Sequence, residues 1–187
     1  DHPAVGEEWL GGPMTIMRNL RLLNQTLRDV QARGAPRLDA TDLSRRPDGQ
    51  VKVKVFPRDG YDRLLYGGFT AEIWTEPGVS QDEVLTGVAG LYRQGVRDGD
   101  GAVALVLGAG NVASIGPMDV LHKLFAEDQV CLLKMNPVNE YLGPFVMRGL
   151  APLVKDGVLR LAYGGAKVGE YLVHHEAVDE IHITGSD

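Results

Sequence analysis

The sequence predicts an α/β protein in which a doubly wound, Rossmann-like parallel sheet, at about residues 102–187, follows a region with a helix and an antiparallel hairpin. From residue 102 onward, strand-like and helical segments alternate in the order βαβαβαβ, which is typical of parallel sheets with helices on both faces. The first strand segment, AVALVL at 102–107, is wholly apolar, which is typical of strands that are buried on both faces. Glycine makes up 24 of the 187 residues, roughly twice the ~7% average usage, and much of this excess follows these strands.

Residues 1–100 are predicted to form a separate helix and hairpin region. Its expected elements are a helix at 14–33, strands at 51–57 and 69–75, and a helix at 81–97. The first helix has apolar residues at helical spacing and ends where Gly34 and Pro36 disfavour its continuation. The strands alternate apolar and polar residues, which predicts an antiparallel pair. The second helix opens at Ser80, three residues before Glu83, in the sequence pattern of a capping box.

Residues 101–187 are predicted to form the parallel-sheet domain. Its strands are expected at 102–107, 130–134, 158–163 and 180–184, with helices at 114–126, about 140–155 and 165–174. Ligands of such sheets bind outside the carboxyl ends of the strands, so residues there are the first candidates for a site. The last strand leads into a Gly-Ser turn with no helix after it, and the domain is therefore expected to be incomplete at its carboxyl end.

Composition excludes several functional classes. The single cysteine, Cys131, rules out an internal disulfide framework and fits a reducing compartment such as the cytoplasm. No apolar segment approaches the ~20 residues needed to cross a bilayer, so no membrane partner is expected. The formal net charge is -6 and the basic residues are scattered, which argues against a nucleic-acid partner because phosphate binding needs clustered Lys and Arg.

A glycine-rich turn follows the first strand of the predicted parallel sheet. Gly108, Gly110 and Asn111 belong to the segment GAGNVA at 108–113, which matches the G-x-G-x-x-A pattern of dinucleotide-binding turns. That pattern normally requires an acidic residue about 20 positions on, which binds the ribose hydroxyls. Here the second strand ends in Lys134, whose ammonium can donate to ribose oxygens or pair with a 2′-phosphate. A plain strand-to-helix turn is the alternative interpretation of the two glycines.

Residues 103–187 resemble the cofactor-binding domain of the aldehyde dehydrogenase superfamily. Three elements match in order and spacing: Asn111 just after the first strand, Lys134 23 residues later, and ITGS at 183–186. The glycine-containing helix that begins at Gly165 also resembles the family. The resemblance covers roughly the last 85 residues, and the segments GNV and LLKM are similar to the acyl-CoA reductase branch of the same superfamily.

The resemblance implies a role for each matching residue. Lys134 would bind the adenosine ribose of NAD, or the 2′-phosphate of NADP. Asn111 would be catalytic, because its side-chain amide would donate to the oxyanion that develops on the substrate. The implied cofactor-binding residues are Gly108, Gly110, Lys134, Asn136, Gly165, Gly169, Gly185 and Ser186. This sequence departs from the family pattern at two positions that would contact the cofactor. Pro137 stands where the family commonly has a ribose-binding Glu, with Glu140 nearby, and Gly110 stands where the family often has an aromatic residue.

The catalytic cysteine and general-base glutamate of the family lie beyond the ITGS segment, so the resemblance implies that this chain is roughly the first half of a longer enzyme. Cys131 is no substitute, because it lies inside the apolar strand at 130–134 and is expected to be a buried thiol with a raised pKa. No metal site is predicted for His174, His175 and His182. Adjacent histidines point to different faces of a helix, and no cysteine accompanies them.

The sequence therefore predicts an NAD(P)-dependent, aldehyde dehydrogenase-like oxidoreductase, of which this chain is the cofactor-binding portion and is inactive by itself. The substrate would be an aldehyde or an acyl thioester, and the intact enzyme is expected to be a homo-oligomer. Three alternatives stay open. They are a reductase of acyl-CoA or another acyl thioester from the same superfamily, a Rossmann dehydrogenase or sensor that binds the pyrophosphate at residues 108–113, and a non-catalytic assembly domain that pairs through the hairpin at 51–75.

Overall fold

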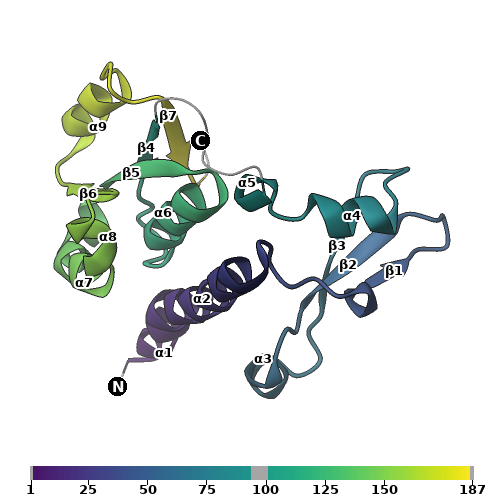
Figure 1. Ribbon diagram of the computed structural model, residues 1–187. Coiled ribbons are helices and arrows are strands. Elements are labelled where there is room, and N and C mark those ends of the chain that lie inside the picture. Colours follow the sequence, from purple (N-terminus) through teal and green to yellow (C-terminus); the bar gives the residue numbers. More distant parts are fainter. Residues whose placement is uncertain (1, 94–100, 186–187) are drawn as a thin grey trace. The chain divides into compact units, whose positions relative to one another are not determined.

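The computed structural model describes residues 2–93 and 101–185 (Figure 1). The chain is a mixed α/β protein with two separate sheets in two compact units. Of the described residues, 2–25 and 101–185 form the unit that holds the parallel sheet, and 26–93 form the unit that holds the antiparallel sheet. The first 25 residues thus group with the parallel sheet, whereas the sequence placed a single division near residue 100. Within these ranges no helix is both long and apolar enough to cross a bilayer.

Four parallel strands form the first sheet, in the order β6-β5-β4-β7. They are β4 (Ala102–Leu107), β5 (Gln129–Lys134), β6 (Leu159–Ala162) and β7 (Glu180–Ile183). All four lie where the sequence predicts strands. The central strand β4 consists of β-branched and aliphatic residues that suit burial on both faces, whereas β7, at the edge, is only partly buried. In register, Leu107 lies opposite both Lys134 and Ile183, and Lys134 lies opposite Ala162. The carboxyl ends of the four strands therefore meet at one edge.

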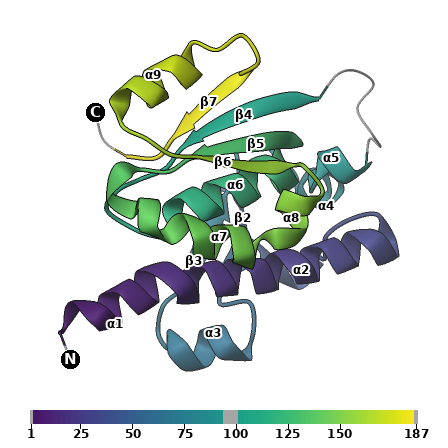
Figure 2. The same ribbon diagram turned by 90° about the vertical axis from the view of Figure 1, so that its left-hand side faces the viewer.

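Helices cover both faces of the parallel sheet, as Figure 2 shows. α6 (Ile115–Ala126), α7 (Gly143–Gly149) and α8 (Ala151–Lys155) lie on one face, and α9 (Ala166–Val173) lies on the other. The core on the first face is built on fully buried strand residues such as Val106, Leu133 and Leu159, against which Leu20 and Leu23 of an N-terminal helix also pack. Alternate strand residues point to opposite faces, so Lys134, next to Leu133, lies on the face that α9 covers.

The prediction of one continuous helix at about 140–155 is wrong. The structure has a 3₁₀ helix, η3 (Pro137–Leu142), followed by α7 and α8 as separate helices. Pro144 and Pro152 stand in the first turns of α7 and α8. A proline lacks the N–H that a continuous helix needs and disfavours helical geometry in the residue before it, so each proline starts a new helix.

The N-terminal helix starts earlier than the sequence predicts. α1 (Ala4–Trp9) continues through one π-helical segment, η1 (Leu10–Met14), into α2 (Thr15–Arg33). The prediction of a helix at 14–33 is confirmed, but the Gly-Gly-Pro sequence before it is helical rather than irregular. The wider π turn accommodates Pro13 inside the helix. Gly12 lies beside Ala113: a Cβ built at Gly12 would be 3.5 Å from the Cβ of Ala113, an ordinary contact distance.

The second unit holds an antiparallel sheet of three strands, in the order β1-β2-β3. β2 (Val51–Phe56) pairs with β3 (Ala71–Trp74) as predicted, and β1 (Leu43–Arg45) adds a strand where the sequence predicts no element. A short helix, α3 (Gly60–Leu65), occupies the connection between β2 and β3, so this connection is longer than an ordinary hairpin loop. Leu43, Val51 and Val53 form the small core of this unit.

The helix predicted at 81–97 is shorter and interrupted. Ser80 and Glu83 form the expected capping box at the start of α4 (Gln81–Gly87). The chain then leaves helical geometry at Val88, which is extended, and at Ala89, whose φ is 53°. A second short helix, α5 (Gly90–Arg93), follows, and the remainder of the predicted helix, 94–97, lies outside the described residues.

Candidate functional site

The carboxyl edge of the parallel sheet collects the residues predicted to form the site. They are Gly108, Gly110 and Asn111 after β4, Lys134 and Asn136 at the end of β5, Gly165 and Gly169 at the start of α9, and Gly185 after β7. Ser186 lies outside the described residues. Asn111, the predicted oxyanion donor, has an exposed side chain. These predicted residues therefore bring one cation, two amide side chains and several glycines to the edge.

Lys134 is the charged residue among these predicted site residues, and its side chain is largely buried. Only 6% of its surface is exposed, since it lies at the end of β5 under the α9 side of the sheet. Within residues 2–93 and 101–185, no hydrogen bond or ion pair involves its ammonium group. Burying a charge is costly unless an opposite charge or hydrogen bonds compensate it. The ammonium is not among the buried polar atoms that lack a partner, so it reaches solvent. Lys134 thus has a buried stem and an ammonium group to which the described part of the chain offers no counter-charge.

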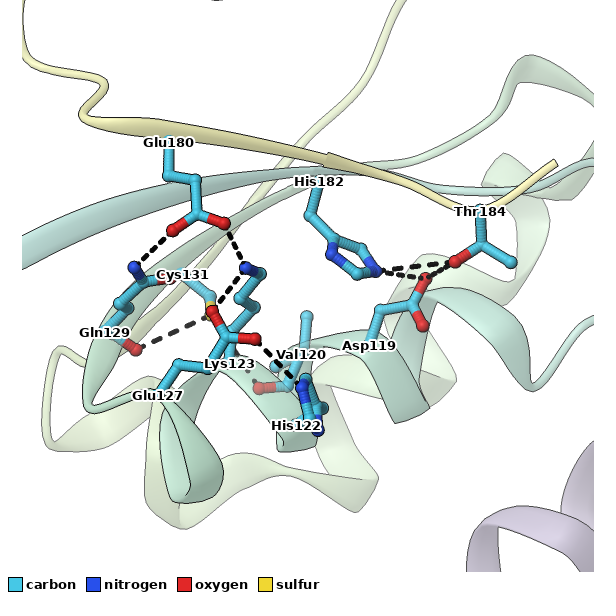
Figure 3. Close-up of polar contacts among 10 residues, drawn as sticks. All are labelled: Asp119, Val120, His122, Lys123, Glu127, Gln129, Cys131, Glu180, His182 and Thr184. Atoms are coloured by element: carbon cyan, nitrogen blue, oxygen red, sulfur yellow. Dashed lines mark hydrogen bonds and ion pairs between the residues drawn. The ribbon is translucent and has the colours of Figure 1, made fainter. Parts of the chain in front are cut away.

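Lys123, the other buried lysine of the described residues, is fully compensated (Figure 3). Its Nζ lies 2.6 Å from Oε2 of Glu127 and also contacts Oε1 of Glu180, whose second carboxylate oxygen accepts a bond from Gln129. Burial alone would lower the pKa of Lys123, but the hydrogen bonds to Glu127 and Glu180 outweigh it and raise the pKa. Gln129 and Glu180 begin their strands, so this cluster lies at the amino end of the sheet, away from Lys134.

Gly108 and Gly110 are explained by contacts within the chain. The Gly108 N–H donates to the Lys134 carbonyl at 2.9 Å, and a Cβ at residue 108 would lie 3.1 Å from that oxygen. A Cβ at residue 110 would lie 3.0 Å from Oδ1 of Asn136. These distances are tighter than ordinary contacts, so both glycines let the loop after β4 pack against the loop after β5.

Gly165, Gly169 and Gly185 differ from these two glycines. A Cβ at any of the three would meet no heavy atom within 4 Å. The described part of the chain therefore gives no packing reason for glycine at these positions. Glycine inside a helix, as at residue 169, costs about 0.5–1 kcal/mol relative to alanine. The open side of α9 and of the turn after β7 leaves room for the backbone to approach a ligand.

The segment after β5 ties the neighbouring loops together, and sequence reasoning missed its role. Oδ1 of Asn136 accepts the Val138 N–H at 3.0 Å and caps η3. Nδ2 of Asn139 donates to the Ala109 carbonyl at 3.0 Å, and Oε1 of Glu140 accepts the Gly164 N–H at 2.5 Å. An Asn directly before a Pro, as here, is a helix-start signal that could have located η3. The loops after β4 and β6 are therefore both fastened to η3.

A second tie joins the end of β7 to α6 (Figure 3). Oγ1 of Thr184 donates to Oδ2 of Asp119 at 2.9 Å, and Nε2 of His182 lies 3.5 Å from the same oxygen. The sequence reading left Asp119 without a role. Because Thr184 directly precedes Gly185, this bond fixes the start of the turn that follows β7.

Cys131 is a buried core thiol, as the sequence predicts. It is 4% exposed, and its Sγ donates to the Val120 carbonyl at 3.7 Å. Burial raises the pKa of its thiol to about 12. A thiol in this state is almost wholly protonated at neutral pH, and only the thiolate is a good nucleophile. Cys131 therefore does not serve as a nucleophile for chemistry at the carboxyl edge.

The histidines do not assemble into a metal site. His174 and His175 lie at the end of α9, whereas His182 lies on β7 beside Asp119. In the part of the chain that the structure describes, no group of three or more His, Cys, Asp or Glu side chains has the geometry to hold a metal ion.

The edge as a whole suits an anionic ligand that lies against the backbone. The Lys134 ammonium, the open glycines and the start of α9 lie at the same edge, and backbone N–H groups at a helix start bind phosphate well.

Comparisons of the chain with protein-family models, with curated proteins and with solved structures found no match.

Proposed function

We propose that this chain binds NAD(P) at the carboxyl edge of its parallel sheet, as the nucleotide-binding part of an oxidoreductase similar to the aldehyde dehydrogenases. Numbered along the chain, the four strands have the order 3-2-1-4. This order is the first part of the 3-2-1-4-5-6 order of Rossmann sheets, which bind dinucleotides where the strand order reverses. The reversal falls between β4 and β7, beside Asn111 and Gly185.

Lys134 carries this proposal. A lysine that is 6% exposed and has no counter-charge in the described chain is stabilised when an anion binds beside it. Its position, at the end of the second strand, is where dinucleotide-binding sheets contact the adenosine ribose, with an acidic residue for NAD or a cation for the 2′-phosphate of NADP. Lys134 therefore favours NADP over NAD.

The glycines support a particular placement of the nucleotide. At Gly108 and Gly110, the loop after β5 already occupies the space beside the glycine. At Gly165, Gly169 and Gly185, this space is open among the described residues. The pyrophosphate would accordingly lie near α9 and the turn after β7, as the family resemblance implies, rather than on residues 108–113, as in a conventional Rossmann dehydrogenase.

Asn111 is the residue of this chain that would take part in the reaction. The bound nicotinamide would supply hydride transfer. The exposed Asn111, in the loop after β4, would donate to the oxygen of an aldehyde or acyl thioester as negative charge develops on it. Cys131 is buried and its pKa is raised, so the nucleophile would come from elsewhere in a larger, homo-oligomeric enzyme. A single unpaired cysteine suits the reducing cytoplasm.

Calorimetric titration of the 187-residue chain with NADP and with NAD tests the proposal. We expect NADP to bind more tightly, and Lys134→Met to weaken NADP binding at least tenfold and remove the preference, since an ion pair with a phosphate is lost. Lys155→Met, at an exposed residue that ends α8, is the matched control and should bind both nucleotides unchanged. The proposal is wrong if neither nucleotide binds, or if the Lys134 variant binds both as the wild type does.

A pair of glycine variants tests where the pyrophosphate lies. Gly185→Ala should weaken nucleotide binding while leaving stability unchanged, because its Cβ meets no atom of residues 2–93 and 101–185. Gly110→Ala should lower stability through its contact with Asn136. Loss of binding confined to the Gly110 variant, with full stability, would favour the conventional Rossmann mode instead.

A further inference from the structure

The short helix η3 reaches from the end of β5 to the loop after β6. Its Glu140 accepts a hydrogen bond from the Gly164 N–H, with 2.5 Å between Oε1 and N. The next residue after η3, Gly143, packs directly against the ring of Tyr163, and any side chain at residue 143 would overlap that ring. Two adjacent residues of the loop after β6, Tyr163 and Gly164, are thus held from the same side.

Gly164 directly precedes the N-cap of α9. Its φ is 122°, and a Cβ there would lie 2.6 Å from Cγ2 of Val168, so its backbone conformation is available only to glycine. Gly165 follows as the N-cap of α9, and its carbonyl accepts the N–H groups of Val168 and Gly169 at 3.1 and 3.2 Å. The bond from Gly164 to Glu140 therefore fixes where α9 begins.

We infer that Glu140 is a positioning residue for the nucleotide: its carboxylate holds Gly164 so that the open side of Gly165 and Gly169 faces the ligand, and it does not itself bind the ribose. This inference rests on the function proposed above. A hydrogen bond between a backbone N–H and a carboxylate is stronger than one between neutral groups. A loop held in its binding geometry loses less conformational entropy when the ligand arrives.

Two substitutions separate positioning from direct contact. Glu140→Gln keeps an oxygen acceptor for the Gly164 N–H, whereas Glu140→Ala removes it. We expect the Ala variant to bind NADP about tenfold more weakly in a calorimetric titration, because one charge-assisted hydrogen bond is lost. The Gln variant should stay within about threefold of the wild type, because the remaining bond is neutral. Glu176→Ala, an exposed residue beyond α9, is the control and should bind NADP as the wild type does.

Amide hydrogen exchange at Gly164, followed by NMR, gives a readout that does not depend on nucleotide. In the absence of ligand, exchange of this amide should be at least tenfold faster in the Ala variant than in the wild type, and close to wild type in the Gln variant. Adding NADP to the wild-type chain should leave the amide protected. If NADP instead exposes it, the carboxylate has moved to the ribose and the inference is overturned.

The remaining outcomes are distinguishable. If the wild type binds NADP and all Glu140 variants bind it equally well, this inference falls and the proposed function stands. If Gln is as damaging as Ala, the carboxylate itself contacts the ligand, which also overturns the inference. If the wild type binds neither nucleotide, the proposed function falls and takes this inference with it. Should the Ala variant fail to fold, the Gln variant and the effect of NADP on the Gly164 amide decide the question.

Discussion

Replacing each of the two buried lysines by methionine should change the stability of the parallel-sheet unit in opposite directions. Lys123 and Lys134 are 2% and 6% exposed and belong to the same unit. Methionine has a similar length and flexibility but carries no charge. The two substitutions therefore differ mainly in what surrounds the lost ammonium group.

Lys134→Met should raise stability in the absence of ligand. The substitution removes a partly desolvated cation that has no partner in the described chain. Because the ammonium itself reaches solvent, its desolvation cost is only partial, and the free energy of unfolding should rise by less than about 1 kcal/mol. The unit would then be more stable but should bind NADP less tightly.

Lys123→Met should lower stability, because it leaves Glu127 and Glu180 facing each other without their shared cation. Removing one partner of a buried ion pair costs about 3–5 kcal/mol. The side chains of Glu127 and Glu180 are 34% and 43% exposed, and solvent screens part of their repulsion. A loss of about 2–3 kcal/mol is therefore expected.

Urea unfolding followed by far-UV circular dichroism, with exchange of the Cys131 amide in the middle of β5 as a local probe, measures both effects. A change of about 2 kcal/mol shifts the midpoint by roughly 1 M urea. The reasoning is refuted if Lys134→Met destabilises the unit as Lys123→Met does. That result would mean that Lys134 already has a counter-charge in the protein, and the argument for a bound phosphate would lose its basis.

Three further predictions follow from the same contacts. Gly169→Ala should stabilise α9 by about 0.5–1 kcal/mol, because its Cβ meets nothing, yet weaken NADP binding in the same titration; unchanged binding would place the nucleotide elsewhere. Gly108→Ala should destabilise by about 1–3 kcal/mol, because its Cβ would lie 3.1 Å from the Lys134 carbonyl, and a neutral result in urea unfolding would contradict the packing described. The hydrogen bond from Lys123 lowers the pKa of Glu127, so its stabilisation is complete above the unfolded value near 4.3 and is lost as pH falls from there through the lower folded value. Acid titrations of stability should show this loss in the wild type and a weaker one in Lys123→Met.

The strands of the parallel sheet could be predicted because the signal is local. The runs at 102–107 and 130–133 contain apolar residues without interruption, and the predicted strands at 102–107 and 130–134 agree with β4 and β5 to within one residue. β1 could not be predicted in this way, because three residues, of which Leu43 alone is buried, carry no periodicity. The break at Ala89 is likewise set by its positive φ, which no residue type in that segment demands.

The location of the candidate site could be predicted, but its internal contacts could not. Parallel strands bring their carboxyl ends together whatever the loops contain, so Lys134 and the glycines were expected at one edge. The bond from Glu140 to Gly164 joins residues of two different loops, and only the fold places them side by side. Likewise, whether Lys134 has a partner depends on where every nearby carboxylate points. Nor does the motif at Gly108 reveal that this glycine packs against the Lys134 carbonyl, a contact that only the structure shows.

Burial of the Cys131 thiol has a practical consequence for spectroscopy. The sequence contains one cysteine, and a thiol with a pKa of about 12 reacts slowly with maleimides at neutral pH. A cysteine introduced at an exposed position, such as Lys155 at the end of α8, would therefore take up a fluorophore or spin label selectively. The native chain already serves as a silent background for site-specific labelling, without removal of its own cysteine.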